Sequence, residues 1–498
     1  MQSNRKCKTC RTRRIKCDGA EPICNKCIKA QRTCVPLEDT ESHAFTIHIE
    51  NQYASGEEQR PRGPRSSLTP LQPTLQLRTR AVAYFMQNHF QMFEDMPDVS
   101  MTWAECFHEW GAAGNRSDMV DLGLSSLSLA VFAKAQSWKP AAMEGCGLYL
   151  QLLQAMQTRI PRIHRGDLSQ NEIDECLLTI HFMARYESLV QSQSEDGDEK
   201  MALQSMKVWF HFDGAVAILK SWSNSRQEHK TPTSAIKLTR RTIIRTNLLR
   251  EQRIAEWLAH GSSFGEFGTS QQFDSIVGNI INLHQEYLAL KQKSANQDIS
   301  TFDIETLFQT SYEIERDILD WPSKLPYRYA FTESDSLRSS NTPVDPFTLS
   351  PTLICAKPGY SLLWNEYHSM GMLLINTRLK IINLVSPENR HPEHEAAVEP
   401  SIYQFNSWTE KLINMIPFSL GKIPELSSTA GKPEAIPEGE VFKPYKANLA
   451  VWSIAIASSL EMLDPERREF FRRHLEKMAA ASSECLIGYV LSGYWMVL

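Results

Sequence analysis

The chain has 498 residues, a formal net charge of −5 and 22% charged residues, so it is long enough to bury large cores and to form about three domains. It contains no run of 18 or more apolar residues, which excludes a membrane-spanning helix and predicts a soluble protein without a membrane partner. Its first residues lead directly into basic residues and cysteines, so we expect no secretory signal, a reducing compartment and no disulfides.

Charge is unevenly distributed along the sequence. Residues 1–34 carry ten Lys or Arg residues against Asp18 and Glu21, a formal charge of +8. The remainder carries 43 basic and 56 acidic residues, a formal charge of −13. If the cysteines of the N-terminal segment held two zinc ions as thiolates, this segment would keep a charge of about +6. A basic segment on an acidic body predicts a polyanionic partner for that segment alone.

Six of the eleven cysteines lie within 28 residues, in the pattern Cys-x2-Cys-x6-Cys-x6-Cys-x2-Cys-x6-Cys. These candidate zinc ligands are Cys7, Cys10, Cys17, Cys24, Cys27 and Cys34. Two tetrahedral zinc ions need eight ligand positions, which six thiolates fill only if two of them bridge. The pattern is one half-motif written twice, and this symmetry predicts Cys7 and Cys24 as the bridges. A disulfide knot, a metallothionein-like protein and a protein-binding zinc module are the alternatives.

The segment between the second and third cysteines is strongly basic. Arg11 and Arg14 are three residues apart, which places them on one face of a predicted short helix, and Arg13 and Lys16 form a second basic edge. Ile15 is predicted to turn inward against the cluster. Because so short a helix is marginal alone, we expect metal binding and folding to be one event. A helix this basic fits the major groove, where Arg pairs bidentately with guanine.

The sequence from Cys7 to Asp18, together with Pro22 and the last three cysteines, resembles the fungal binuclear zinc-cluster (Zn2Cys6) transcription factors. The resemblance implies a nuclear, non-enzymatic, sequence-specific regulator of RNA polymerase II transcription that holds two Zn²⁺ ions and reads CGG-like triplets in double-stranded DNA. The basic residues expected to contact DNA are Lys8, Arg11, Arg13, Arg14 and Lys16. Further expected partners are co-regulators or the transcription machinery, and control of a metabolic gene cluster fits this family. Where the family usually has Lys, three residues before the third cysteine, this chain has Arg14.

The sequence predicts a small zinc-cluster DNA-binding domain at residues 1–36, a flexible linker without a coiled coil at 37–73, and a large all-α regulatory region at 74–498. Proline-rich breaks near 321–358, 386–400 and 417–444 separate the helical blocks of this region, which forms one or two lobes. Ser169 and Glu172 are predicted to form a capping box. Three apolar stripes at helical spacing are predicted core faces: Val82, Phe85, Met86, Phe90 and Phe93; Ile173, Leu177, Ile180 and Met183; Ile276, Ile280, Leu283, Tyr287 and Leu290. Any homodimer is expected to form through this region.

Other motifs in the body have simpler interpretations. Segment 209–219 is similar to a Trp-His-Gly-Ala motif of the same family, which implies a regulatory or effector-sensing helical domain. Segment 261–265 spells a hydrolase elbow but follows a helical pattern, so we expect a loop. The histidines at 391 and 394 lie in a predicted polar linker, acidic segment 192–199 is expected to be a solvated loop, and the five scattered cysteines are expected to be buried. The alternative function is a zinc-module interaction protein or a non-specific nucleic-acid binder.

Overall fold

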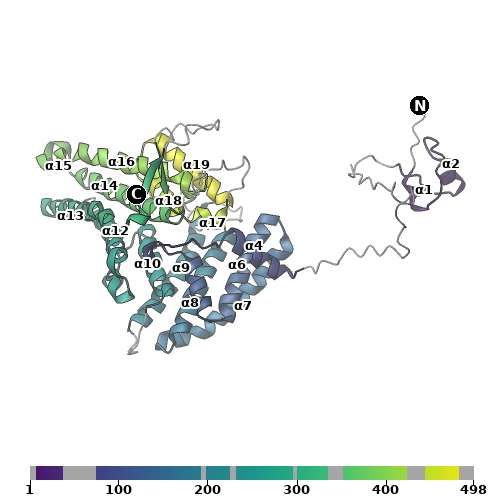
Figure 1. Cartoon of the computed structure of the whole chain (residues 1–498), viewed down its shortest axis with the longest axis horizontal. Coiled ribbons are helices and arrows are strands. Elements are labelled where there is room, and N and C mark those ends of the chain that lie inside the picture. Colours follow the sequence, from purple (N-terminus) through teal and green to yellow (C-terminus); the bar gives the residue numbers. More distant parts are fainter. Residues whose placement is uncertain are drawn as a thin grey trace, which may run out of the picture. The chain divides into compact units, whose positions relative to one another are not determined.

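The computed structural model describes residues 7–36, 75–191, 198–224, 232–294, 300–334, 351–422, 443–481 and 498. Its contacts divide the chain into two compact units, residues 1–74 and residues 75–498, each of which is described by itself (Figure 1). The linker predicted at 37–73, acidic residues 192–197 and Cys485 lie outside the described residues. Within the described ranges, none of the helices has the length and apolar character needed to cross a membrane.

The N-terminal unit contains two short helices, α1 (Lys8–Thr12) and α2 (Asn25–Lys29). Cys7 and Cys24, which are 17 positions apart, are the N-cap residues of these helices. Each helix is followed by a residue with a left-handed backbone, Arg14 after α1 and Gln31 after α2, again 17 positions apart. The half-motif that is repeated in the sequence is therefore also repeated in the backbone.

The first half of the body is a group of long helices with α6 at its centre. Its helices are α4 (Leu77–Asn88), α5 (Trp103–Ala112), α6 (Asp118–Gln136), α7 (Lys139–Arg165), α8 (Gln170–Gln191), α9 (Asp198–Asn224) and α10 (Ser234–Leu249). Helix α6 packs against α4, α7 and α8 (Figure 1). Even its serines at 125, 126 and 128 are buried, because neighbours cover it on several sides.

The second half of the body is built around α14, which packs against α12, α13, α16 and α18 (Figure 1). Its helices are α11 (Glu256–Ala259), α12 (Gly268–Ser294), α13 (Thr301–Asp320), α14 (Tyr360–Ile382), α15 (Pro392–Ala396), α16 (Val398–Ser419), α17 (Pro444–Ala447), α18 (Val451–Ser459) and α19 (Pro465–Ala481). Gly371 allows α14 to approach α16 closely, because a Cβ atom there would lie 2.6 Å from the buried ring of Trp408.

The described part of the body is helical apart from one small antiparallel pair of strands. Strands β1 (Phe331–Ser334) and β2 (Thr352–Cys355) pair Phe331 with Cys355, a hairpin that the sequence did not predict. The predicted fold class is otherwise confirmed. One continuous hydrophobic core extends from Phe85 to Leu498, so the described body is a single unit and not two lobes.

The predicted capping box is present at the start of α8. A carboxylate oxygen of Glu172 accepts a hydrogen bond from the backbone N–H of Ser169 at 2.9 Å, and the Ser169 hydroxyl accepts one from the N–H of Glu172 at 3.4 Å. Both later apolar stripes, in α8 and α12, are buried as predicted. These local patterns therefore identified two core faces correctly.

Three predictions about the body are wrong. The first apolar stripe does not form one helix, because α4 ends at Asn88 and Phe90 enters the core from the turn that follows. His394 does not lie in a polar linker: Pro392 begins α15, and His394 is buried with its Nε2 atom 2.9 Å from Glu305. Among the described scattered cysteines, Cys146 is exposed, because it lies on an outer position of α7.

Candidate zinc centre and nucleic-acid interface

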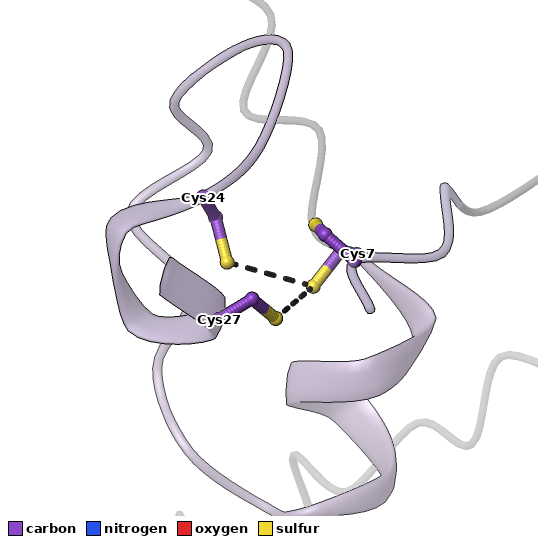
Figure 2. A group of neighbouring side chains, drawn as sticks. Cys7, Cys24 and Cys27 are labelled. Carbon is purple, nitrogen blue, oxygen red and sulfur yellow. Dashed lines mark hydrogen bonds between the residues drawn. The ribbon is translucent and has the colours of Figure 1, made fainter. Parts of the chain in front are cut away.

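The six N-terminal cysteines come together in the N-terminal unit. Five of them are buried and Cys34 is half-buried. Figure 2 shows three of the sulfur atoms pointing toward one another: that of Cys7, the N-cap of α1, and those of Cys24 and Cys27 at α2. The Sγ atom of Cys7 lies 3.7 Å from that of Cys24 and 3.7 Å from that of Cys27. Residues from both halves of the repeat therefore share one centre.

The sulfur atoms form two overlapping groups of four. One group is Cys7, Cys10, Cys17 and Cys24; the other is Cys7, Cys24, Cys27 and Cys34. Within each group the ligand atoms lie within 4.8 Å of one another. Tetrahedral zinc with Zn–S bonds of about 2.3 Å separates its sulfur ligands by about 3.8 Å. The Sγ–Sγ separations of 3.6 to 3.9 Å within these groups fit two such ions, and Cys7 and Cys24 belong to both groups.

The protonation of the thiols depends on their surroundings. The backbone N–H of Cys10 lies 3.3 Å from the sulfur of Cys7 and lowers the pKa of that thiol to about 6, because it stabilises the thiolate. Burial raises the pKa of Cys10 to about 12 and also raises the pKa of Cys24. Zinc binds thiolates, so metal binding at this centre displaces protons.

Hydrogen bonds tie the two halves of the cluster domain together. The hydroxyl of Thr9 donates to the carbonyl of Thr33 at 2.8 Å and accepts from the N–H of Val35 at 3.2 Å. The carboxylate of Asp18 accepts from the N–H of Asn25, the first residue of α2, at 3.1 Å. No sequence pattern identifies Thr9, because its role depends on contacts with residues 24 and 26 positions away.

The five predicted DNA-contacting residues are all exposed, but they do not lie on one helix. Lys8 and Arg11 are in α1, which ends at Thr12, whereas Arg13 is the C-cap residue and Arg14 and Lys16 follow it. Within residues 7–36, none of the five lies at ion-pair distance from a carboxylate. The cations of this segment are therefore available to an anionic partner.

The prediction that Arg11 and Arg14 share a helix face is wrong. The N–H of Arg14 donates to the carbonyl of Arg11 at 3.1 Å, and the N–H of Ile15 donates to the carbonyl of Cys10 at 3.2 Å. Together with the φ of +54° at Arg14, these bonds form a Schellman motif that ends α1 and turns the chain back toward Cys17. Ile15 does not turn inward either, since 39% of it is exposed.

Comparison with known proteins agrees with this geometry. Residues 5–43 match the family described as "Fungal Zn(2)-Cys(6) binuclear cluster domain". The chain carries a fungal Zn(2)-Cys(6) binuclear cluster domain. This domain binds two zinc ions through its six cysteines.

A curated relative supports the same assignment over the same region. The chain is similar to the transcription activator AMTR1 of Alternaria alternata, with 50% identity over 36 residues, or 7% of this chain. The chain covers 5% of that relative's length, so the likeness concerns the cluster domain alone. No solved structure matches the chain.

Proposed function

We propose that this protein is a nuclear, DNA-binding transcription factor that regulates RNA polymerase II transcription. In this proposal residues 1–36 bind DNA, residues 37–73 form a linker and residues 74–498 regulate activity. The observation that carries the proposal is a set of five exposed cations between Lys8 and Lys16, on the rim of a centre that fits two zinc ions. A rigid, basic unit of this size suits the phosphates and base edges of a DNA duplex.

The residues have different roles in this proposal. Arg14 reads a guanine of a CGG-like triplet through its O6 and N7 atoms, since its planar guanidinium can form two parallel hydrogen bonds. Lys8, Arg11, Arg13 and Lys16 contact phosphates and set affinity. The Schellman turn supports this assignment, because it separates Arg14 from the helix on which Lys8 and Arg11 lie. Control of a metabolic gene cluster remains part of the proposal.

We infer that Cys7 and Cys24 bridge the two zinc ions. Their membership of both groups of four sulfur atoms supports this assignment. Cys24→Ala should then weaken the binding of both zinc ions, whereas Cys34→Ala should weaken the binding of only one. Native mass spectrometry during titration with a chelator measures the loss of each ion. Loss of a single ion in Cys24→Ala would argue against the bridging role.

Binding of a zinc-loaded fragment of residues 1–60 tests DNA recognition. Its affinity is measured at one fixed salt concentration for a duplex that contains one CGG triplet and for a scrambled duplex of the same composition. We expect a preference of about tenfold for CGG, because one bidentate arginine–guanine contact is worth about 1–3 kcal/mol. Equal affinity would favour the alternative, a non-specific nucleic-acid binder. Absence of DNA binding would favour a protein-interaction module.

A further inference from the structure

The body contains a cavity of about 280 Å³, and all of its lining residues belong to the body. Its walls come from residues as far apart in the chain as Phe90 and Trp452. They belong to the segment between α4 and α5, the first turn of α5, helices α8, α9, α10, α14 and α18, and the turn before α18. The cavity therefore lies where both halves of the body meet. Its size is near the lower end of the roughly 300–1,000 Å³ that small-molecule sites occupy.

Most of the cavity wall is apolar and partly aromatic. Leu177 and Ile180 of α8 face it together with Leu238 of α10. Phe212 and Ala215 also line it, and both belong to segment 209–219 of α9, the motif for which the sequence implied a regulatory role. Such walls favour an apolar ligand, since burial of apolar surface drives binding.

The wall also carries polar atoms that the described residues do not satisfy. Buried atoms without a hydrogen-bond partner in the described part of the chain occur on four lining residues: Ser100 Oγ, His181 Nε2, Arg241 Nε and Trp452 Nε1. Native proteins leave few buried polar atoms unpaired, because each one loses its bonds to water. A molecule that offers hydrogen-bond acceptors to the indole and guanidinium N–H groups would satisfy those donors.

The charges of the described lining residues favour an anion. Three guanidinium groups, those of Arg185, Arg241 and Arg245, share the wall with one carboxylate, that of Glu366. Arg241 is held by Asp98, at 2.8 Å, and by Glu266, neither of which lines the cavity. These two carboxylates compensate the charge of Arg241. The contact of Arg245 with Glu366 uses only its Nε atom, so its terminal N–H groups can donate to a negative group in the cavity.

His181 contributes a flat, neutral surface to the same wall. Its ring stacks on that of Trp103, with ring centroids 4.2 Å apart and an angle of 15° between the planes. Burial lowers the pKa of His181 well below its ordinary value, so the ring carries no charge. The stacked pair and the apolar residues around it suit a planar group.

We propose that this cavity binds a small aryl carboxylate, a mostly apolar, planar molecule with one negative group. The acidic group pairs with the unsatisfied donors of the wall, and the aromatic part lies among the apolar side chains. Because the walls join distant parts of the body, the ligand stabilises the whole unit 75–498 when it binds. The proposal concerns ligand binding by the body and does not depend on DNA recognition by the cluster domain.

Isothermal titration calorimetry on the zinc-loaded full chain tests the proposal. The probes are 2-naphthoate and its neutral analogue 2-naphthamide. We expect saturable binding of one 2-naphthoate per chain, a rise in the melting temperature of the body, and an affinity for 2-naphthamide at least about tenfold lower, since a hydrogen bond to a charged group is worth more than one to a neutral group.

Two variants on α9 form a matched pair. Ala215→Leu places a larger side chain in the cavity and should weaken 2-naphthoate binding by at least about tenfold. Ala217→Leu adds the same side chain to an exposed position of the same helix, outside the cavity, and should leave the affinity unchanged. If Ala215→Leu fails to fold, Trp452→Phe tests the same site, because it keeps an aromatic ring but removes the indole N–H; we expect binding about tenfold weaker.

Three results would overturn the proposal. The first is no saturable binding of either probe, which would mean that water satisfies the polar wall. The second is equal affinity for 2-naphthoate and 2-naphthamide, which would contradict the anionic class. The third is unchanged 2-naphthoate binding in a folded Ala215→Leu variant and in Trp452→Phe, which would locate the probe elsewhere.

Discussion

Arg14 and Gln31 hold the same left-handed backbone conformation, with φ values of 54° and 49°, at equivalent positions of the two halves of the zinc cluster. The turn at Gln31 has the same two hydrogen bonds as that at Arg14: its own N–H donates to the carbonyl of Ile28 at 3.0 Å, and the N–H of Arg32 donates to that of Cys27 at 3.1 Å. Glycine is the usual residue at this position of a Schellman motif, because it has no Cβ atom. The backbone of this domain is therefore strained at two positions, Arg14 and Gln31.

Gln31→Gly should relieve this strain and stabilise the zinc-loaded domain by about 0.5–1 kcal/mol. It removes no cation, so the affinity for DNA should stay the same. The measurement is the urea midpoint of a zinc-loaded fragment of residues 1–74, followed by a DNA titration of the same sample. A lower midpoint would mean that the Gln31 side chain makes a stabilising contact that outweighs the strain.

Arg14→Gln should relax base specificity, because it removes the guanidinium that we assign to guanine but keeps a side chain on the left-handed residue. We expect a loss of about 1–3 kcal/mol on a CGG duplex and a small loss on scrambled DNA. Lys16→Gln is the matched control: it should weaken binding to both duplexes and reduce the dependence of affinity on salt. Equal losses of Arg14→Gln on both duplexes would show that Arg14 contacts phosphates.

The zinc centre could be predicted from sequence because its ligands are defined by spacing. The path of the chain between the ligands could not be predicted in this way. Residues between Cys10 and Cys17 have helical spacing and no glycine, so nothing in the sequence marked the turn at Arg14. The turn is imposed by the need to return Cys17 to the sulfur cluster. A local propensity was therefore overridden by metal-ligand geometry.

In the body, periodicity identified helices whose stripes are continuous, such as those of α8 and α12. It failed where a core residue lies beyond a helix end, as Phe90 does, because spacing alone does not report where α4 stops. Periodicity could not predict the cavity either. Its walls combine residues from Phe90 to Trp452, and only the packed fold brings them together.

Asp174→Asn should stabilise the body at neutral pH. Burial raises the pKa of Asp174 to about 6, although hydrogen bonds from Thr233, at 2.6 Å, and from Gln170 oppose the rise. The folded chain therefore keeps a proton that the unfolded chain releases at lower pH, so stability falls as pH rises from about 4 to about 6. Asp174→Asn removes the cost of ionising this buried carboxyl. It should raise the free energy of unfolding by as much as about 3 kcal/mol above pH 6, and by little near pH 4.

Urea midpoints of the full chain at pH 4.5 and pH 7.5 measure this difference. Asp167→Asn is the control, because Asp167 forms an exposed ion pair with Arg165, which contributes little to stability. An equal shift of the midpoint at both pH values in Asp174→Asn would contradict the titration and indicate a change in packing instead.

The oligomeric state should depend on the body. No coiled coil is predicted after the cluster, so a fragment of residues 1–74 should sediment as a monomer and bind a single triplet weakly. The full chain should bind paired triplets cooperatively at several spacings, because the linker predicted from sequence at residues 37–73 would let two clusters reach them. Sedimentation velocity and gel-shift assays on both proteins measure this. A stable dimer of the 1–74 fragment with one strict spacing would reveal a dimerisation element within residues 37–73.

Selection from a random duplex library by the zinc-loaded full chain tests the central claim most directly, because it presumes no binding site. The bound DNA is sequenced after several rounds at fixed salt, in parallel with the Arg14→Gln variant. We predict strong enrichment of CGG-like triplets by the wild-type chain, at variable spacing, and loss of preference at one base of the triplet in the variant. DNA recovered without any enriched sequence, or an identical motif for both proteins, would contradict sequence-specific reading by this cluster domain through Arg14.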